Sequence, residues 1–337
     1  MKDPGFRPVT LHDIAEATGY TINTVSRALK DKDDISRETR AYIQRVAREM
    51  GYVRNYLASS LRSGRTRTLA MIVGSMINPF YAILTDLIQR EAIRLGYSLI
   101  ILCHQDDPDV ELKSVEMAIS RQADGVLITP CSFDSPGLKM LRESGLPYVL
   151  LSRYLEGEGD RDDYVLCDDE QGGYLAGKHL IEAGHRKLAM ISAEEVVYSS
   201  RKRFSGFRRA CTEAGIAEVP YAQCGENGEI LARLEQWMRE GVTGVFSFCD
   251  VEAWNAITLL EENGHRVPRD LVFVGFDNIL GYMNFPKSIC SVDCHLQEEA
   301  CTAIDLLRKR IHDRSLPPQQ VILPVDLVCR GCCRPET

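Results

Sequence analysis

The larger part of the chain alternates short apolar runs with amphipathic stretches. Residues 68–74 (TLAMIVG) form the first apolar run, and the amphipathic stretch 79–95 follows it. A short apolar run between turn signals is typical of a buried strand, whereas an apolar period of 3.6 residues indicates a helix. The same alternation predicts further strands at 97–103, 125–129, 148–151, 164–167, 188–192, 245–248 and 271–275. It predicts further helices at 109–122, 135–144, 171–183, 201–214, 228–239 and 251–263.

Repeated strand–helix units predict an α/β fold with parallel sheets that helices cover on both faces. About 270 residues follow the first 66, which is enough chain for two lobes with cores of their own. In such sheets a ligand lies beyond the carboxyl ends of the strands. We therefore expect ligand-binding residues in the loops at those ends.

The start of the chain follows a different pattern, that of short helices with polar first turns. Thr10 precedes Asp13 by three positions, and Thr21 and Ser36 stand at the starts of two further helical patterns. Each hydroxyl can cap the amino end of a helix. Gly19 can adopt the positive φ that ends the first one. Two short helices joined by a glycine turn, with a third behind them, have the layout of a DNA-reading helix-turn-helix.

The second of these helices would expose polar side chains and one arginine. Ile22 and Asn23 lie in its first turn, the part that enters a major groove first, and Arg27 follows one turn later. Asn pairs with adenine and Arg with guanine through two hydrogen bonds, and an apolar side chain contacts a thymine methyl. A three-helix bundle with a merely polar surface would give the same pattern.

Charge distribution favours DNA binding by the first unit. The whole chain has a net charge of −8, but residues 1–67 hold 13 Lys and Arg against 8 Asp and Glu, a net charge of +5. The remaining residues hold 27 against 40, a net charge of −13. A basic first unit on an acidic body is typical of a protein in which one domain contacts phosphates.

Residues 9–64 resemble the headpiece of the LacI/GalR family of transcriptional regulators, on the strings VTLHDIA, GYTINTVSRAL and NYLASSLRSG. The resemblance implies that Ile22, Asn23 and Arg27 read bases. It also implies that segment 55–64 is a hinge helix that folds on operator DNA. A leucine of that helix enters the minor groove, and Ala58 and Leu61 stand at the matching positions. The other reading of Leu61 is a linker residue packed on the body. The implied phosphate-backbone contacts are Thr10, Thr24, Ser26, Ser36, Thr39 and Asn55.

Residues 68–331 resemble the same family, whose core is similar to periplasmic sugar-binding proteins, on strings such as NPFY, GGYLA, RFSGF and VGFDN. The resemblance implies a small effector bound between two lobes, with a sugar-like molecule as one candidate. The implied effector-binding residues are Phe80, Tyr81, Arg153, Arg203, Cys249 and Asp277. Aromatic faces suit a sugar ring or a base, arginines donate forked hydrogen bonds, and a carboxylate accepts from hydroxyls. Packed aromatics, a surface arginine and a capping carboxylate are the ordinary alternatives.

Three positions depart from the pattern of sugar-binding relatives. Ser152 stands where an aspartate is frequent, Cys249 where an asparagine is frequent, and Cys294 where a glutamine is frequent. A hydroxyl-rich monosaccharide would find fewer partners here, and unpaired buried hydroxyls are costly. A plain pentose or hexose effector is therefore in doubt, and a less polar ligand or a partner protein stays open.

No motif predicts a cofactor or a metal. The chain lacks a G-x-G-x-x-G string and a G-x-x-x-x-G-K-[ST] string, and its 12 cysteines do not supply the two C-x-x-C pairs of a structural zinc site. Cys329, Cys332 and Cys333 could bind a thiophilic metal or sense oxidation, but simple substitution is the favoured interpretation. The absence of a signal peptide or a membrane-length apolar run, together with free thiols, predicts a cytoplasmic protein.

The expected protein is a DNA-binding transcriptional regulator, a repressor acting as a homodimer on palindromic duplex operator DNA under control of a small effector, and not an enzyme. Its DNA-binding domain is expected at 8–52, a hinge at 53–66 and the core at 67–331. The amino-terminal lobe would comprise about 67–163 plus 293–322, and the carboxyl-terminal lobe about 164–292 plus 323–331. The alternatives are a solute-binding protein with a helical extension, or a carbohydrate-acting enzyme that pairs carboxylates from the set Asp168, Asp169, Asp250 and Asp277.

Overall fold

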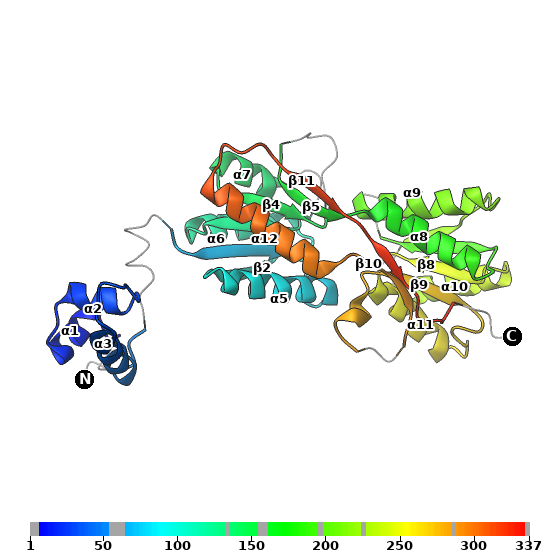
Figure 1. Cartoon of the computed structure of the whole chain (residues 1–337). Helices are drawn as coiled ribbons and strands as arrows, with labels where there is room; N and C mark the ends of the chain where they lie inside the picture. The colour runs from blue at the N-terminus through cyan, green and yellow to red at the C-terminus, as the bar shows by residue number, and fades with distance from the viewer. Residues whose placement is uncertain are drawn as a thin grey trace, which may run out of the picture. The chain divides into compact units, whose positions relative to one another are not determined.

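The computed structural model of the chain consists of two compact units, Met1–Thr66 and Arg67–Thr337 (Figure 1). The structure describes residues 7–53, 65–131, 135–153, 161–193, 198–223, 227–284 and 287–333. We call the first unit the headpiece and the second the core.

Three helices make up the described part of the headpiece: α1 (Leu11–Thr18), α2 (Ile22–Ala28) and α3 (Arg37–Glu49). Thr10, Thr21 and Ser36 cap their amino ends, as the sequence predicts, and Gly19 ends α1 with φ of 73°. Short helices of this length are marginal alone, so their packing against one another holds them. The side chains that form the shared core are Ile14, Val25, Ala28, Ile43 and Ala47.

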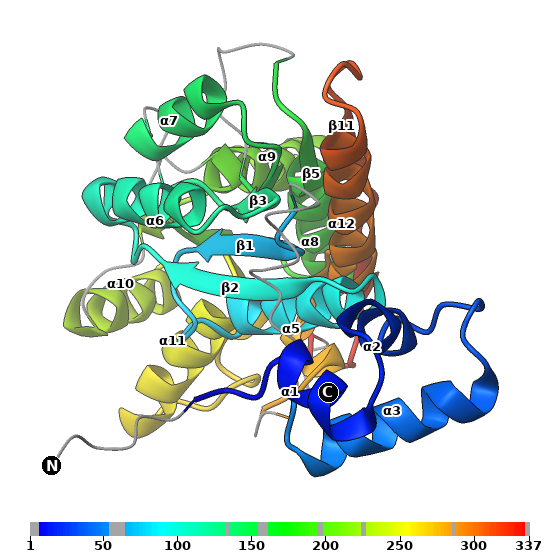
Figure 2. The ribbon, with the colours of Figure 1, turned by 90° about the vertical axis from the view of Figure 1, so that its left-hand side faces the viewer.

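The first sheet of the core is parallel in the order β11-β5-β4-β3-β1-β2. Its strands are β1 (Thr68–Val73), β2 (Ser98–Cys103), β3 (Gly125–Ile128), β4 (Tyr148–Leu151), β5 (Tyr164–Cys167) and β11 (Gln320–Leu323). Helices α5 (Pro79–Arg94) and α12 (Leu296–His312) pack together on one face, and α6 (Pro108–Ser120) and α7 (Pro136–Ser144) on the other (Figure 2).

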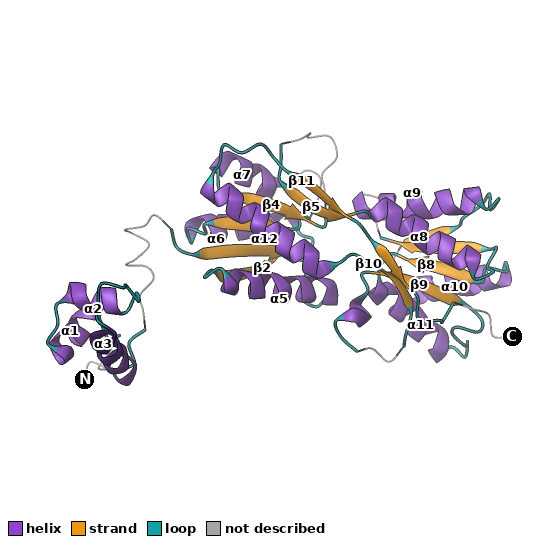
Figure 3. Cartoon of the chain, in the orientation of Figure 1, coloured by secondary structure: helices purple, strands orange, loops and turns teal. Residues whose placement is uncertain are grey.

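The second sheet has the order β12-β10-β9-β8-β6-β7 and is parallel except for β12. Its strands are β6 (Leu188–Ser192), β7 (Tyr221–Gln223), β8 (Gly244–Ser247), β9 (Val272–Phe276), β10 (Cys290–Asp293) and β12 (Asp326–Val328). Helices α8 (Asp169–Glu182) and α9 (Tyr198–Glu213) pack side by side, and so do α10 (Asn227–Arg239) and α11 (Asp250–Glu262) (Figure 3). A short 3-10 turn, Ile279–Gly281, follows β9.

The two sheets confirm the two-lobed α/β core with parallel sheets that the alternation predicts. The chain passes between the lobes three times, after β5, between β10 and α12, and between β11 and β12. The expected lobe boundary near residue 163 is wrong in one respect: β5 pairs with β4 and β11, so Tyr164–Cys167 belongs to the first lobe. Its apolar run would suit either sheet, because pairing partners and not local pattern decide which sheet a strand joins.

Among the described residues, no helix combines the length and the apolar character that crossing a bilayer requires.

Candidate functional site

The outer face of α2 carries the residues expected to read bases. Ile22 is 46% exposed, and Asn23 and Arg27 are also exposed, while Val25 and Ala28 on the opposite face are fully buried. This division fits a helix that packs on its neighbours by one face and offers the other to a groove.

Arg27 is not free in this structure, because its guanidinium forms an ion pair with Asp34 in the loop after α2. Both side chains remain partly exposed, at 49% and 42%. A surface pair of this kind contributes little stability and is readily exchanged for another partner. The structure therefore presents the arginine with a competing carboxylate that a base would have to displace.

The hydroxyls expected to contact phosphates stand at helix starts, except that of Ser26, which lies in the second half of α2. The Thr24 side chain exchanges a 2.9 Å hydrogen bond with Thr21, and Ser36 donates to the Thr39 hydroxyl at 2.9 Å. Thr10 donates to the Asp13 carboxylate at 2.7 Å, and Ser26 is half-buried on α2. Helix starts carry unpaired amides and positive potential, so these positions favour an anion. Asn55, Ala58 and Leu61 lie outside the described residues.

In the core, Arg203 of α9 is one of the two most enclosed of the expected effector contacts, at 6% exposure. Its Nε donates to Asp169 Oδ1 at 2.7 Å and its Nη1 to the Phe248 carbonyl at 2.6 Å. The guanidinium carbon lies 3.5 Å from the Phe276 ring centroid and 4.6 Å from that of Phe248. Burial alone would lower the pKa of Arg203, but Asp169 and Asp277 raise it above its ordinary value. The side chain therefore stays charged, and Nη2 has no partner in the described chain.

Asp277 follows β9 and is only 4% exposed. Its Oδ1 lies 3.9 Å from Arg203 Nη1, but the described residues donate no hydrogen bond to its carboxylate. Its φ of 97° is in the left-handed region, where a residue with a side chain is strained. Burial raises the pKa of Asp277 well above its usual value, against the effect of Arg203. Buried carboxyls are normally hydrogen-bonded, so this one is suited to a ligand donor.

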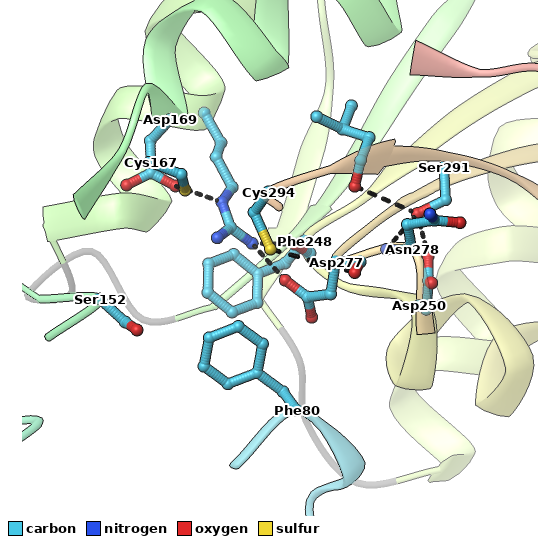
Figure 4. Close-up of polar contacts among 12 residues, drawn as sticks. Phe80, Ser152, Cys167, Asp169, Phe248, Asp250, Asp277, Asn278, Ser291 and Cys294 are labelled. Atoms are coloured by element: carbon cyan, nitrogen blue, oxygen red, sulfur yellow. Dashed lines mark hydrogen bonds and ion pairs between the residues drawn. The ribbon is translucent and has the colours of Figure 1, made fainter. Parts of the chain in front are cut away.

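Asp250 is buried beside this site and holds the loop that carries Asp277. It accepts from the Ser291 hydroxyl at 2.6 Å and from the Ile279 amide at 2.8 Å, and Ser291 in turn accepts from the Asn278 amide at 2.9 Å (Figure 4). Burial raises the pKa of Asp250 to about 7, although these hydrogen bonds oppose the shift. Its role is therefore to position the loop.

The first lobe contributes an aromatic pair and an arginine. Asn78 caps α5, which places Phe80 and Tyr81 in its first turn with ring centroids 5.2 Å apart and planes at 80°. Arg153 Nη1 donates to Asp106 Oδ1 at 2.9 Å. Burial raises the pKa of Tyr81; Arg153 opposes the shift, and Asp106 and Asp277 add to it. The Tyr81 hydroxyl thus lies within electrostatic reach of both arginine–carboxylate groups.

Residues from both lobes meet around Asp277. Figure 4 shows the rings of Phe80 and Phe248 beside the Asp277 carboxylate, with Asn278 next to Asp277 in the chain and Asp250 of α11 and Ser291 of β10 beside Asn278. The structure therefore brings Phe80, Tyr81, Arg203 and Asp277 into one neighbourhood.

The three departures from the sugar-binding pattern are turned to internal contacts. Ser152 donates to Glu299 Oε1 at 2.8 Å, and the Cys294 thiol points to the Asp277 carbonyl at 3.9 Å. Cys249 starts α11 without a side-chain capping bond and is 8% exposed. Burial raises the pKa of Glu299 to about 7. Fewer polar groups therefore remain for a ligand than the aspartate, asparagine and glutamine would provide.

The structure adds residues that the sequence analysis missed. Asp106 binds Arg153, Phe248 and Phe276 enclose Arg203, and Glu299 binds Ser152. A positional signal existed for Asp106 and Phe248, since they follow the carboxyl ends of β2 and β8. Glu299 gave no such signal, because it lies inside α12.

Comparison with known proteins agrees with both units. A family model for bacterial regulatory proteins of the lacI family matches residues 10–55, and one for a periplasmic binding protein-like domain matches residues 178–333. The HTH-type transcriptional regulator DegA of Bacillus subtilis (strain 168) is 31% identical, over 97% of this chain and 98% of DegA.

Two solved structures extend the likeness to the fold. The transcriptional regulator CelR in complex with cellobiose is 27% identical with a TM-score of 0.70, over 97% of this chain and 100% of CelR. The Lac repressor dimer bound to operator and an anti-inducer is 21% identical with a TM-score of 0.82, over 97% of this chain and 100% of the repressor chain. With its helix-turn-helix headpiece and two-lobed core, the chain belongs to the LacI family of bacterial regulatory proteins and is a DNA-binding transcriptional regulator of the LacI/GalR type.

Proposed function

We propose that the protein is a homodimeric repressor whose headpieces read a palindromic operator, and whose core binds a small effector that changes operator affinity. The carrying observation is Asp277, a nearly buried carboxyl that accepts no hydrogen bond from the described chain and lies beside Arg203. A site of this kind suits a ligand with donor groups.

In the headpiece, Ile22, Asn23 and Arg27 read base edges in the major groove, because they occupy the exposed face of α2. Thr10, Thr24, Ser26, Ser36, Thr39 and Asn55 contact the phosphate backbone, and Ala58 and Leu61 enter the minor groove between two half-sites. Two-fold symmetry of the protein then requires a two-fold operator, as in the Lac repressor dimer bound to its operator. This role places the protein in the cytoplasm with the chromosomal DNA.

In the core, Phe80, Tyr81, Arg153, Arg203, Cys249 and Asp277 contact the effector. The aromatic faces pack on a ring, Arg203 Nη2 donates to a ligand oxygen, and Asp277 accepts from hydroxyl or amide groups. Relatives are solved with cellobiose and with ribose. Because Ser152 and Cys294 are turned to internal contacts, we propose a ring-containing effector with fewer hydroxyls than a free hexose.

Catalysis on a carbohydrate is not favoured by this geometry. Asp169 and Asp250 are committed to Arg203 and to Ser291 with the Ile279 amide, respectively. Neither Asp169 nor Asp250 is therefore free to act as the acid or base partner of Asp277.

The test begins with selection of an operator from random DNA by the purified chain, followed by a thermal-shift screen of small metabolites. A true effector raises the Tm and changes operator affinity at fixed salt. Asp277→Asn should lose both effects of the effector while keeping operator binding. Glu218→Gln, the same charge change at an exposed site of the core, should keep them.

The DNA half of the proposal has its own variants. Arg27→Ala should weaken specific binding by about 1–3 kcal/mol and relax base choice at one position, whereas Arg45→Ala on α3 should not relax it. A chain that selects no sequence, with or without metabolites, contradicts the proposed function.

A further inference from the structure

The end of the chain returns to the second lobe and brings three cysteines together there. Cys290 is the first residue of β10, and Cys332 and Cys333 follow β12. The Cys290 and Cys332 sulfurs lie 3.4 Å apart. One imidazole joins them: a ring nitrogen of His179, Cys290 Sγ and Cys333 Sγ all lie within 4.8 Å of one another.

The imidazole lacks a partner of its own. His179 lies in the last turn of α8, and its Nε2 is buried with no hydrogen-bond partner. A buried polar atom without a partner is costly, and native structures seldom leave one. The imidazole ring lies beside the sulfurs of Cys290 and Cys333, which are ligands of the same class of metal ion.

The spacing fits a tetrahedral ion. Zn–S bonds of about 2.3 Å and Zn–N bonds of about 2.0–2.1 Å place two sulfur ligands roughly 3.8 Å apart and a sulfur and a nitrogen ligand roughly 3.5 Å apart. The 3.4 Å between the Cys290 and Cys332 sulfurs is slightly shorter than this S···S separation, and the 4.8 Å limit on the ligand atoms of His179, Cys290 and Cys333 leaves a small adjustment. Two backbone amides already support the sulfurs: Arg330 N donates to Cys290 Sγ at 3.3 Å, and Cys290 N donates to Cys332 Sγ at 3.1 Å. Hydrogen bonds from backbone amides to sulfur stabilise thiolate ligands.

We propose that His179, Cys290, Cys332 and Cys333 form a Cys₃His zinc site that fastens the end of the chain to the second lobe. Zinc binds as Zn²⁺ and displaces the thiol protons without any change of oxidation state. On sequence alone, simple substitution was favoured at Cys332 and Cys333, because the family usually has small or polar residues there. The sequence does not display the other ligands as neighbours, since Cys290 and Cys332 are 42 residues apart.

A second group of side chains in the core that could ligate a metal has no unpaired ligand nitrogen. His104, Glu111 and Cys131 also lie within reach of one another. However, His104 Nε2 is hydrogen-bonded to the Thr129 carbonyl at 2.9 Å, and Glu111 accepts from the Cys131 amide at 2.6 Å and from Ser135. Its polar atoms are already satisfied, so no ion is needed there.

The site would also stiffen the loop behind the effector residues. Arg330, two residues before Cys332, donates to the Ile289 carbonyl at 3.0 Å and to Asn278 Oδ1. Asn278 follows Asp277 directly. A metal that fixes the end of the chain would therefore hold the loop that carries Asp277.

The test measures metal in the full-length protein, purified under reducing conditions without chelator or added metal. We expect about one zinc per chain by elemental analysis. Cobalt(II) chloride added to the metal-stripped protein should give the near-ultraviolet thiolate-to-metal band and the strong visible bands of tetrahedral coordination. Cys332→Ser and His179→Ala should lose at least about tenfold in metal affinity, a loss typical of a missing ligand or its support. Cys301→Ser removes an exposed thiol of α12 and should leave binding unchanged.

If a variant folds poorly, metal removal and addition in the wild-type protein still test the proposal. A strong chelator should lower its Tm, and zinc chloride should restore it. Less than about one-tenth of a zinc per chain, with no cobalt–thiolate band, overturns the proposal. A Cys290–Cys332 disulfide found by peptide mass spectrometry in the freshly purified reduced protein overturns it as well.

Discussion

At the scale of single residues, the free protein holds its key side chains with internal partners that a ligand or a base must replace or complete. Arg27 is paired with Asp34 in the headpiece, and Arg203 is paired with Asp169 in the core. The first pair is half exposed and weak, whereas the second is buried, so breaking it costs much more free energy. Arg203 is thus a fixed donor, while Arg27 has to change partners.

Removal of the competing carboxylate should strengthen operator binding. Asp34→Asn frees Arg27 and should raise operator affinity by up to about 1 kcal/mol beyond the effect of charge alone. Asp33→Asn is the matched control, since it makes the same charge change on an exposed neighbour that contacts Arg40. Operator titrations of both variants at one salt concentration measure the difference. Equal affinities would show that the ion pair does not restrain Arg27.

Glu299 should make the core less stable as pH rises. Its pKa is raised by burial from 4.5 to about 7, so folding favours the protonated form. The folded chain then binds more protons than the unfolded chain between these values, and stability is lost as pH rises through about 7. Glu299→Gln should therefore gain stability over the wild type at pH 8, by roughly 3 kcal/mol at most, and little at pH 4. Thermal melts at both pH values measure this.

The neighbouring Glu298 is the control for that experiment because it is exposed on the same helix turn. Glu298→Gln should change the stability relative to the wild type by the same amount at both pH values. A Glu299→Gln effect that is the same at pH 4 and pH 8 would contradict the assigned role of burial.

At the scale of elements, α8 and α9 lie so close that only glycine fits at their contact. A Cβ on Gly173 would lie 1.9 Å from the Arg203 carbonyl oxygen, and one on Gly206 would lie 1.8 Å from that of Glu170. The close approach is what allows Arg203 of α9 to reach Asp169 at the start of α8. Packing of two helices thus sets the geometry of the effector site.

Gly173→Ala should push the helices apart. We expect a loss of about 1–3 kcal/mol or more in stability, well beyond the gain in helix propensity, together with weaker effector binding. Gly228→Ala on α10 meets no atom within 4 Å and should be neutral or mildly stabilising. Melting temperatures of the two variants decide the point, and a Gly173→Ala protein as stable as the wild type would refute the close contact.

Patterns within a few residues of sequence predicted where helices and strands form better than they predicted which elements pack or pair with one another. The caps at Thr10, Thr21 and Ser36 follow from hydrogen bonds three residues apart, which a sequence displays directly. The sheet that Tyr164–Cys167 joins, and the meeting of His179 with Cys290, depend on residues far along the chain. Arg203 and Asp277 were predicted through the resemblance. Only the fold shows that the described residues donate no hydrogen bond to the Asp277 carboxylate.

At the scale of the whole molecule, regulation requires that effector and operator share one coupling free energy. Such couplings are typically 1–3 kcal/mol, about 5–150-fold in affinity. The operator should therefore change effector affinity by the same factor as the effector changes operator affinity. Calorimetric titrations of the effector with and without operator DNA check this, and unequal factors would mean that further states or partners take part.

The triple passage of the backbone between the lobes has a mechanical consequence. Three parallel tethers allow the halves to swing about a shared axis while resisting sliding and separation, so closure on a ligand is a guided rotation. A protease cut in any single tether would leave the other two intact. The nicked protein should stay in one piece in a native gel and fall apart only in denaturant.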